Sequence, residues 1–248
     1  MRTNRVHLPG PLTANARCRI SGNPANHVAR VLRLRVGDPL IVFDGTGGEF
    51  PATIDELGKD GVTVTLAEHD PIERESTLSI TLVQALARGE RMDWIMQKAT
   101  ELGAARIVPL ASERSVVRLD AEQAQARLKH WRAIVIAACE QCGRNRLPEI
   151  TVPMSLAECL SAEPVSETPP ASLRLVLSPG ATLRVRDLEG KPGRVTVLVG
   201  PEGGLSEGEQ QAAERGGFRP LALGPRILRT ETAALTMLAA LQERLGDA

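Results

Sequence analysis

The chain of 248 residues has no tyrosine, and aromatic residues make up only 2% of it. A chain this poor in aromatic rings excludes base stacking as the main source of affinity for a nucleic acid. Its four cysteines are unevenly spaced, which does not indicate a disulfide framework in a chain of this length. No apolar run approaches the length that crosses a membrane, and the polar first ten residues lack the apolar region of a signal peptide. We therefore expect a cytoplasmic protein.

Net charge is absent as well. Thirty basic residues balance thirty acidic ones, which by itself disfavours a nucleic-acid binder. The distribution is uneven, because the segment up to Gly37 holds seven arginines and no acidic residue. Guanidinium groups pair bidentately with phosphate oxygens, so this segment is suited to contact RNA. The alternative is a general preference for arginine, since the whole chain has only four lysines.

The order of predicted elements indicates two different kinds of structure. From Leu78 onward predicted strands alternate with predicted helices, which is typical of an α/β domain with a mainly parallel sheet. Residues 1–70 instead predict a small β-rich unit, with a hairpin signal at Asp60-Gly61. The charged, proline-containing segment 70–76 is the expected linker.

Two glycine-led turns near the C-terminus organise the expected site. The β-branched strand 195–199 stops at GPEGG, residues 200–204, and a capping box of Ser206 and Glu209 opens the next helix. The predicted strand 218–223 is followed by a second turn, 224–232, and then by the last helix. In open α/β sheets ligands bind at the edge where such strands end.

The turns do not carry a phosphate-binding pattern. No Lys-Ser/Thr pair follows the first turn, and the G-x-G-x-x-G spacing is absent. Glu202 would also place a carboxylate where a phosphate has to sit, whereas an acid at such a turn suits ribose hydroxyls or a positive charge. S-adenosylmethionine, which has a ribose and a sulfonium but no phosphate, meets these requirements. On turn chemistry alone, two ordinary turns at a sheet edge are an equal alternative.

The motifs GPEGGLS at 200–206 and LGPRILRTETA at 223–233 resemble the cofactor-binding end of the SPOUT methyltransferases. Within that class the chain resembles the 16S ribosomal RNA (uracil-N3)-methyltransferase family over nearly its whole length. Four inner motifs support this: RMDW at 91–94, QKATELG at 97–103, SERSV at 112–116 and EQCGRNR at 140–146.

The resemblance implies methylation of N3 of one uridine in small-subunit ribosomal RNA, with S-adenosylmethionine as the methyl donor. It implies a PUA-like RNA-binding β-barrel domain at 1–70 and a SPOUT trefoil-knot α/β methyltransferase domain at 71–248. It also implies a homodimer. The particular uridine, and the choice between naked RNA and the assembled subunit as substrate, stay open.

The candidate site residues follow from the strand ends, the two turns and the resemblance. The expected cofactor-binding residues are Leu177, Val199, Gly200, Pro201, Glu202, Gly203, Gly204, Leu223, Gly224, Ile227, Leu228, Arg229 and Thr232. Arg229 is the expected stabiliser of the uracilate anion. Glu202 and Glu231 are the candidate acids for cofactor orientation or proton removal, and the choice between them stays open. The expected RNA-binding residues are Arg5, Arg30, Arg33, Arg114, Gln141, Arg144 and Asn145. Surface or dimer-interface ion pairs are the alternative for Arg114 and Arg144.

We expect no metal. Cys139 and Cys142 fall inside a predicted helix, with no second cysteine pair, and the sulfonium already supplies an activated methyl group. Two other functions stay open: a related knotted methyltransferase that acts on transfer RNA or another ribosomal position, and a non-catalytic RNA-binding protein on the same fold.

Overall fold

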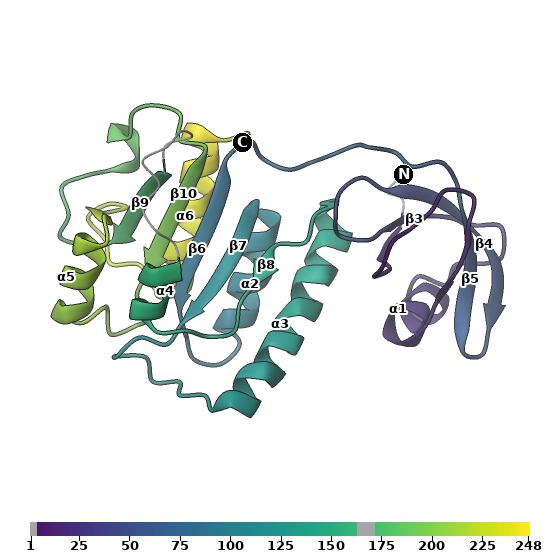
Figure 1. Ribbon diagram of the computed structural model, residues 1–248, viewed down its shortest axis with the longest axis horizontal. Coiled ribbons are helices and arrows are strands. Elements are labelled where there is room, and N and C mark those ends of the chain that lie inside the picture. The colour runs from purple at the N-terminus through teal and green to yellow at the C-terminus, as the bar shows by residue number, and fades with distance from the viewer. Residues whose placement is uncertain (1–3, 163–171) are drawn as a thin grey trace. The chain divides into compact units, whose positions relative to one another are not determined.

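The computed structural model describes residues 4–162 and 172–248, which divide into two compact units (Figure 1). The first unit comprises Met1–Glu75 together with Ile136–Leu147, and the second comprises Ser76–Val135 together with Pro148–Ala248. These units differ from the predicted ranges 1–70 and 71–248, because the linker and a later segment of the chain join the first unit.

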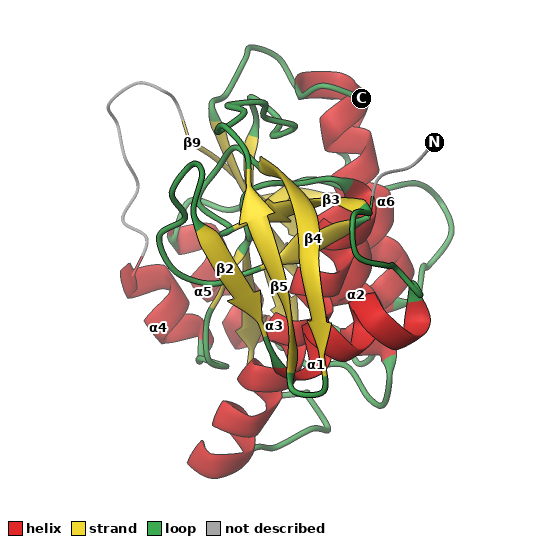
Figure 2. Cartoon of the chain, turned by 90° about the vertical axis from the view of Figure 1, so that its right-hand side faces the viewer, coloured by secondary structure: helices red, strands yellow, loops and turns green. Residues whose placement is uncertain are grey.

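The first unit is built on a five-stranded sheet with the order β1-β3-β4-β5-β2. Its elements are β1 (Arg5–His7), β2 (Arg17–Ile20), α1 (Gly22–Asn26), the π-helical turn η1 (His27–Val31), β3 (Pro39–Phe43), β4 (Phe50–Gly58) and β5 (Gly61–Leu66). Strand β1 pairs in parallel with β3, and the other neighbours are antiparallel. Figure 2 shows β2, β5 and β4 side by side. The hairpin predicted at Asp60-Gly61 joins β4 to β5.

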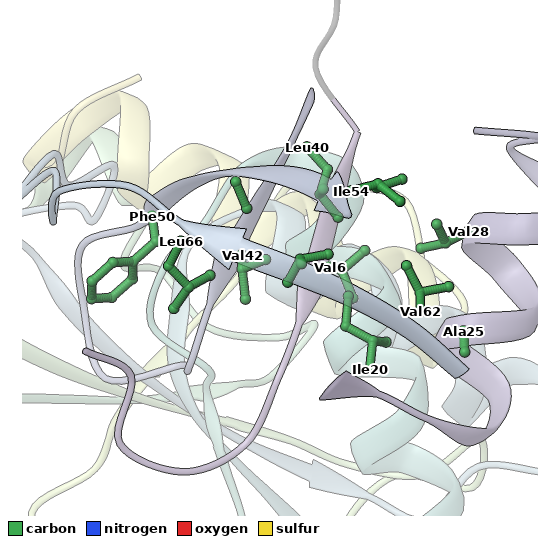
Figure 3. Close-up of a cluster of buried hydrophobic side chains, with 12 residues drawn as sticks. Val6, Ile20, Ala25, Val28, Leu40, Val42, Phe50, Ile54, Val62 and Leu66 are labelled. Atoms are coloured by element: carbon green, nitrogen blue, oxygen red, sulfur yellow. The ribbon is translucent and has the colours of Figure 1, made fainter. Parts of the chain in front are cut away.

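Alternation of side chains explains how this small sheet forms a core. In β4, Phe50, Ala52 and Ile54 are buried while the residues between them are exposed, as expected for a strand with one covered face. Val28 of η1 and Ala25 of α1 pack in the same cluster of buried residues (Figure 3). The short helical segment therefore closes one part of the curled sheet.

A polar network joins the segment 136–147 to the rest of the first unit. Glu49 is 6% exposed, and its carboxylate lies 2.5 Å from Nη1 of Arg5 and 2.9 Å from Nη1 of Arg74. Arg144 donates to Glu75 at 2.5 and 3.0 Å, and the amide of Asn145 donates to a backbone carbonyl of the linker at 2.7 Å. These bonds are the physical reason that the linker and the segment 136–147 belong to the first unit.

The second unit contains a six-stranded, fully parallel sheet with the order β11-β9-β10-β6-β7-β8. Its strands are β6 (Ser79–Ala85), β7 (Ala104–Leu110), β8 (Glu149–Ile150), β9 (Ser172–Leu177), β10 (Arg194–Val199) and β11 (Arg219–Leu221). Its helical elements are α2 (Arg91–Glu101), α3 (Ala121–Cys142, whose last residues belong to the first unit), α4 (Leu156–Ala162), the 3₁₀ turn η2 (Val185–Asp187), α5 (Glu207–Arg215) and α6 (Thr230–Leu245). The predicted α/β fold class is confirmed.

Helices cover both faces of the parallel sheet (Figure 1). On one face, Leu156 of α4 and Ala213 of α5 pack against buried residues of β6, β7 and β10. On the other face, α6 contacts β6 and β10, and α2 packs against α6 and β7. Strands covered on both sides are mostly apolar, and β10 accordingly holds four valine or leucine residues among its six, with Thr196 as its buried polar residue. No helix in the described ranges is both long and apolar enough to cross a membrane.

We expect the Glu49→Gln variant to destabilise the full chain by about 3 kcal/mol at pH 7, because it leaves the Arg5 guanidinium buried without a charged partner. Burial alone would raise the pKa of Glu49, but hydrogen bonds from Arg74 and Arg5 hold it below the ordinary value of 4.5. The carboxylate therefore contributes stability above that ordinary value, and the contribution is lost as the pH falls through the lowered pKa. Urea-induced unfolding at several pH values measures both effects.

The matched control is Asp55→Asn, which removes the carboxylate of the more exposed ion pair between Arg17 and Asp55 in the same unit. A loss below about 1 kcal/mol is expected for that variant. If both variants lose the same free energy of unfolding, the buried network contributes no more to stability than the exposed ion pair.

Candidate functional site

A cavity of about 480 Å³ lies where three neighbouring strands of the parallel sheet end. The strands are β9, β10 and β11, which end at Leu177, Val199 and Leu221, and all three residues line the cavity. The rest of the wall comes from the two glycine turns and the start of α6. The structure therefore opens a cavity at the carboxyl edge of the sheet, where the alternation of elements predicts a ligand.

The first turn keeps its shape through contacts that glycine permits. The amide of Gly204 donates to the carbonyl of Pro201 at 2.9 Å, and Gly204 has a φ of +70°, in the left-handed region that favours glycine. A Cβ on Gly200 would lie 3.1 Å from the backbone nitrogen of Leu205, so a side chain there would crowd the turn. The predicted capping box closes the far side, because Ser206 and Glu209 bond reciprocally at 2.9 and 3.1 Å.

A buried hydrogen-bond chain fixes the first turn to the start of α6. The hydroxyl of Thr230 donates to the carbonyl of Gly200 at 2.7 Å and accepts from the amide of Gln84 at 2.9 Å. Gln84, in β6, is fully buried, and its amide also donates to the carbonyl of Ala85 at 3.0 Å. The turn after β10, the helix α6 and the end of β6 are thereby held in one arrangement.

Arg91, the first residue of α2, links the two candidate acids. Its Nη1 lies 2.5 Å from Oε1 of Glu202, and its Nε lies 3.6 Å from Oε1 of Glu231. Burial by itself would raise the pKa of Glu202, but bonds from backbone N–H groups and from Arg91 lower it below its ordinary value. Glu202 is therefore held as a carboxylate beside the cavity.

The loop after β7 is anchored on the same turn. Arg114 donates to the carbonyls of Gly203 and Leu205 at 3.2 and 3.4 Å, and the amide of Glu113 donates to Glu209 at 2.9 Å. Arg114 is still exposed, so its guanidinium supports the turn and keeps contact with solvent. Arg229, the N-cap residue of α6, lines the cavity, and its side chain makes no hydrogen bond or ion pair with any residue that the structure describes.

Twelve of the thirteen expected cofactor-binding residues line this one cavity, and Thr232 does not. Thr232 lies in the first turn of α6 on its exposed side, while Thr230 and Ala233 reach the wall instead. Of the expected catalytic residues, Glu202 and Arg229 line the cavity, whereas Glu231 lines a second one beside it. Their roles toward a ligand stay predictions.

The expected RNA-binding residues do not form one group. Arg5, Arg144 and Asn145 each form hydrogen bonds in the internal network of the first unit, and their contact with RNA stays a prediction. Arg144 forms an ion pair with Glu75, but the pair is internal to the first unit and not the surface or dimer-interface pair that was the alternative. Arg30, Arg33 and Gln141 are exposed in the first unit, whereas Arg114 belongs to the second.

Several lining residues were not predicted from the sequence. Ser178 and Pro179 directly follow the end of β9, and their position after a strand is the signal that would have found them. Arg91 has no such signal, because its partners Glu202 and Glu231 are more than a hundred residues away in the chain.

The four cysteines all lie in the described ranges. All four are free thiols, and burial raises the pKa of Cys139 to about 12, which keeps that thiol protonated at neutral pH. Within residues 4–162 and 172–248, no three His, Cys, Asp or Glu side chains are grouped as metal ligands.

Comparison with known proteins agrees with the fold and the cavity. The model of an RNA methyltransferase domain matches residues 74–242, and the model of an RNA methyltransferase PUA domain matches residues 20–67. The ribosomal RNA small subunit methyltransferase E of Buchnera aphidicola from Schizaphis graminum is 34% identical, over 99% of this chain and 98% of that protein. The protein of the same name from Bacillus subtilis is 33% identical, over 90% of this chain and 88% of that one.

Two solved structures match the whole fold. A Legionella pneumophila protein, solved with the cofactor SAM bound, is 41% identical with a TM-score of 0.93, and all of both chains is covered. The ribosomal RNA small subunit methyltransferase E of Neisseria gonorrhoeae, bound to S-adenosyl methionine, is 37% identical with a TM-score of 0.89, over 99% of each chain.

The PUA domain, the parallel-sheet α/β domain and the strand-end cavity together define an RNA methyltransferase. More narrowly, the chain belongs to the family of ribosomal RNA small subunit methyltransferase E. The resemblance on which the sequence analysis relied is confirmed.

We expect the Thr230→Val variant to weaken S-adenosylmethionine binding about tenfold, because valine keeps the volume of threonine but removes the bond that fixes Gly200. Isothermal titration calorimetry measures this affinity. Thr232→Val is the matched control, since it makes the same chemical change on the exposed side of the same helix turn. Equal affinities for the two variants would contradict the role given to the Thr230 hydroxyl.

Proposed function

We propose that this protein transfers a methyl group from S-adenosylmethionine to N3 of one uridine in 16S ribosomal RNA. The observation that carries the proposal is the strand-end cavity, whose wall contains twelve of the thirteen residues predicted for this cofactor. Support also comes from the two similar proteins that were solved with the cofactor bound. The printed name of the matched relatives supports small-subunit ribosomal RNA as the substrate, and the resemblance of the motifs supports uracil N3.

The chemistry of the wall fits the cofactor. A volume of about 480 Å³ is in the range of small-molecule sites. Leu177, Leu223 and Leu228 offer apolar surface to an adenine ring, and the backbone groups of the turns suit its polar edge. The carboxylate of Glu202 suits a ribose hydroxyl or the positive sulfonium and would repel a phosphate. These residues would hold the cofactor, which supplies an activated methyl group when bound.

The residues of the chain then have two tasks. They must place N3 in line with the methyl group, and they must stabilise the negative charge that develops when N3 loses its proton. We assign the second task to Arg229, because it lines the cofactor cavity and its guanidinium makes no hydrogen bond to any described residue. The backbone of Arg229 is held in place, because it is the N-cap residue of α6 directly before the anchored Thr230.

The first unit supplies the surface that we propose for RNA. We propose residues 1–70 as the PUA-like RNA-binding domain and 71–248 as the methyltransferase domain, although residues 71–75 and 136–147 of the second range pack in the first structural unit. Arg30 and Arg33 are exposed and make no ion pair within the described part of the chain, so they suit phosphate contacts. Such contacts make affinity fall with added salt.

Three further properties belong to the proposal through the family resemblance. They are a trefoil knot in the last third of the chain, a homodimer, and a cytoplasmic location where ribosomal subunits are made. We propose Arg114 as a contact to RNA or to the second subunit, since it is exposed beside the cofactor turn.

The proposal is tested by methylation of small ribosomal subunits and of naked 16S RNA from a strain that lacks the enzyme, followed by nucleoside analysis. We expect N3-methyluridine at a single position in ribosomal RNA. A different methylated nucleoside would contradict the proposal. So would methylation of transfer RNA alone, or failure to bind S-adenosylmethionine in calorimetry, which would leave only an RNA-binding role.

We expect the Arg229→Ala variant to lower kcat roughly a hundredfold while the affinity for the cofactor changes less than about threefold, because the guanidinium acts on charge that forms only in the transition state. Single-turnover methylation and calorimetry measure the two quantities. Arg215→Ala, which removes an exposed arginine of α5 outside the cavity, is the control and leaves both unchanged. Equal losses of rate and affinity would instead make Arg229 a cofactor-binding residue.

A further inference from the structure

A hollow of about 510 Å³ in the second unit is lined by basic and neutral side chains. We call it the basic hollow, and its residues are Arg118, Leu119, Gln123, Ala126, Arg127 and His130. Arg118 comes from the loop after β7, whereas Arg127 and His130 come from the first half of α3. The basic hollow shares no lining residue with the cofactor cavity, so it is a separate feature of the same unit.

The charge that lines the basic hollow has one sign. Arg127 is exposed and makes no hydrogen bond or ion pair with any residue in the described ranges. No residue three or four positions from it along α3 is acidic, so the usual neutralising neighbours on a helix are missing. Arg118 is exposed and donates to the backbone carbonyl of Glu113 at 2.9 Å. Two guanidinium groups therefore line one concave surface that has no carboxylate, which concentrates positive potential there.

The acidic residues near the basic hollow are engaged elsewhere. Asp120 accepts a hydrogen bond from the backbone nitrogen of Gln123 at 2.8 Å, so its carboxylate caps α3. Asp93 is bonded to His130 at 2.8 Å and orients that ring. From residue 123 to residue 139 the chain holds three arginine or lysine residues and no acidic one. Within the described part of the chain, no carboxylate pairs with Arg118 or Arg127.

The basic hollow lies near the edge of the sheet where the cofactor cavity opens. Strands β7, β6 and β10 are parallel, so the loop after β7 leaves the same carboxyl edge as the first glycine turn. In that loop Arg114 donates to Gly203 of the turn, and Arg118 lines the basic hollow. The backbone positions of Arg114 and Arg118 are at most about 14 Å apart, because a residue spans at most about 3.6 Å. One RNA strand can therefore reach both places.

We propose that the basic hollow binds the phosphate backbone of the RNA strand that carries the target nucleotide. This rests on the proposed function and deepens it, because it gives the methyltransferase unit its own contact with the substrate. Arg118 and Arg127 donate to phosphate oxygens, a group that guanidinium binds well. Phosphate contacts position a strand without selecting its sequence. The basic hollow thus contributes affinity and placement, and the choice of uridine is made at the cofactor cavity.

The first test is the Arg127→Gln variant, which removes one positive charge and keeps a polar side chain. We expect the Kd for RNA to rise about fivefold at about 0.1 M salt, and the slope of log Kd against log salt concentration to fall by about 0.7, because one counterion fewer is released on binding. Filter-binding titrations at several salt concentrations measure both quantities. The RNA is 16S ribosomal RNA, naked or in small subunits, in the form that the unchanged protein methylates.

The matched control is Lys129→Gln, which removes the same charge from an exposed position of the same helix. Lys129 does not line the basic hollow, and two residues turn a helix by about 200°, so it lies on a different face of α3. We expect this variant to keep the Kd and the salt slope of the unchanged protein. Equal effects of Arg127→Gln and Lys129→Gln would show that only net charge matters, and the inference would be wrong.

Two further variants test the chemistry of the contact. Arg127→Lys keeps the charge, so we expect its Kd and salt slope to stay within about twofold of the unchanged values. The double variant Arg118→Gln and Arg127→Gln is expected to raise the Kd about 25-fold and to raise the KM for RNA, while kcat at saturating RNA and the affinity for S-adenosylmethionine are unchanged. A fall in kcat at saturating RNA would instead contradict a role limited to binding the RNA backbone.

Other occupants of the basic hollow give different results. Calorimetry with inorganic phosphate alone tests for a small-anion site. Heat that disappears in Arg127→Gln, together with an unchanged affinity for RNA, would overturn the inference. So would dissociation of a dimer by Arg127→Gln in analytical ultracentrifugation with an unchanged Kd for RNA, because the basic hollow would then be a subunit interface.

Failure of this inference is distinguishable from failure of the proposed function. If the unchanged protein makes N3-methyluridine but the double variant keeps its Kd and salt slope, the inference is wrong and the proposed function stands. If the unchanged protein neither binds S-adenosylmethionine nor methylates uridine, both proposals fail.

Discussion

Parallel pairing of β10 with both β6 and β9 is the constraint on which the site depends. Parallel strands all run the same way, so their carboxyl ends meet at one edge, and β11 adds a third end beside β9. The backbone groups that follow each strand have no further strand to pair with. They become the wall of a cavity, provided that the turns are held in place by contacts outside the sheet.

Those contacts converge on the start of α6. Thr230 binds the first turn through Gly200 and is itself held by the buried Gln84, so a hydroxyl and an amide fix three elements together. The two residues next to Thr230 line different cavities: Arg229 lines the cofactor cavity, and Glu231 lines the second cavity beside it. A displacement of this helix end would therefore alter both cavities at once.

The sequence predicted what depends on neighbours in the chain. The glycine turn, the capping box of Ser206 and the position after each strand end are local features. Most residues that line the cofactor cavity could therefore be predicted from the sequence. The missed features depend on distant partners. The sequence predicts RNA or a surface or interface ion pair for Arg144, and only the fold places the internal Glu75 beside it. Arg91 belongs to the RMDW motif, but the motif does not predict that its partner is Glu202, 2.5 Å away. One sequence contains no record of such pairings, because burial of a charge is decided by the fold.

The first unit is assembled from two stretches that are separated by sixty residues of the second. Its internal charges Arg5 and Glu49 are completed by a linker and by the Arg144-Asn145 corner, all of which are made later than the sheet itself. A growing chain emerges from its N-terminus onward. The polar network of the small sheet is therefore complete only after residues 76–135 of the second unit have been synthesised, so folding of the first unit depends on synthesis of part of the second.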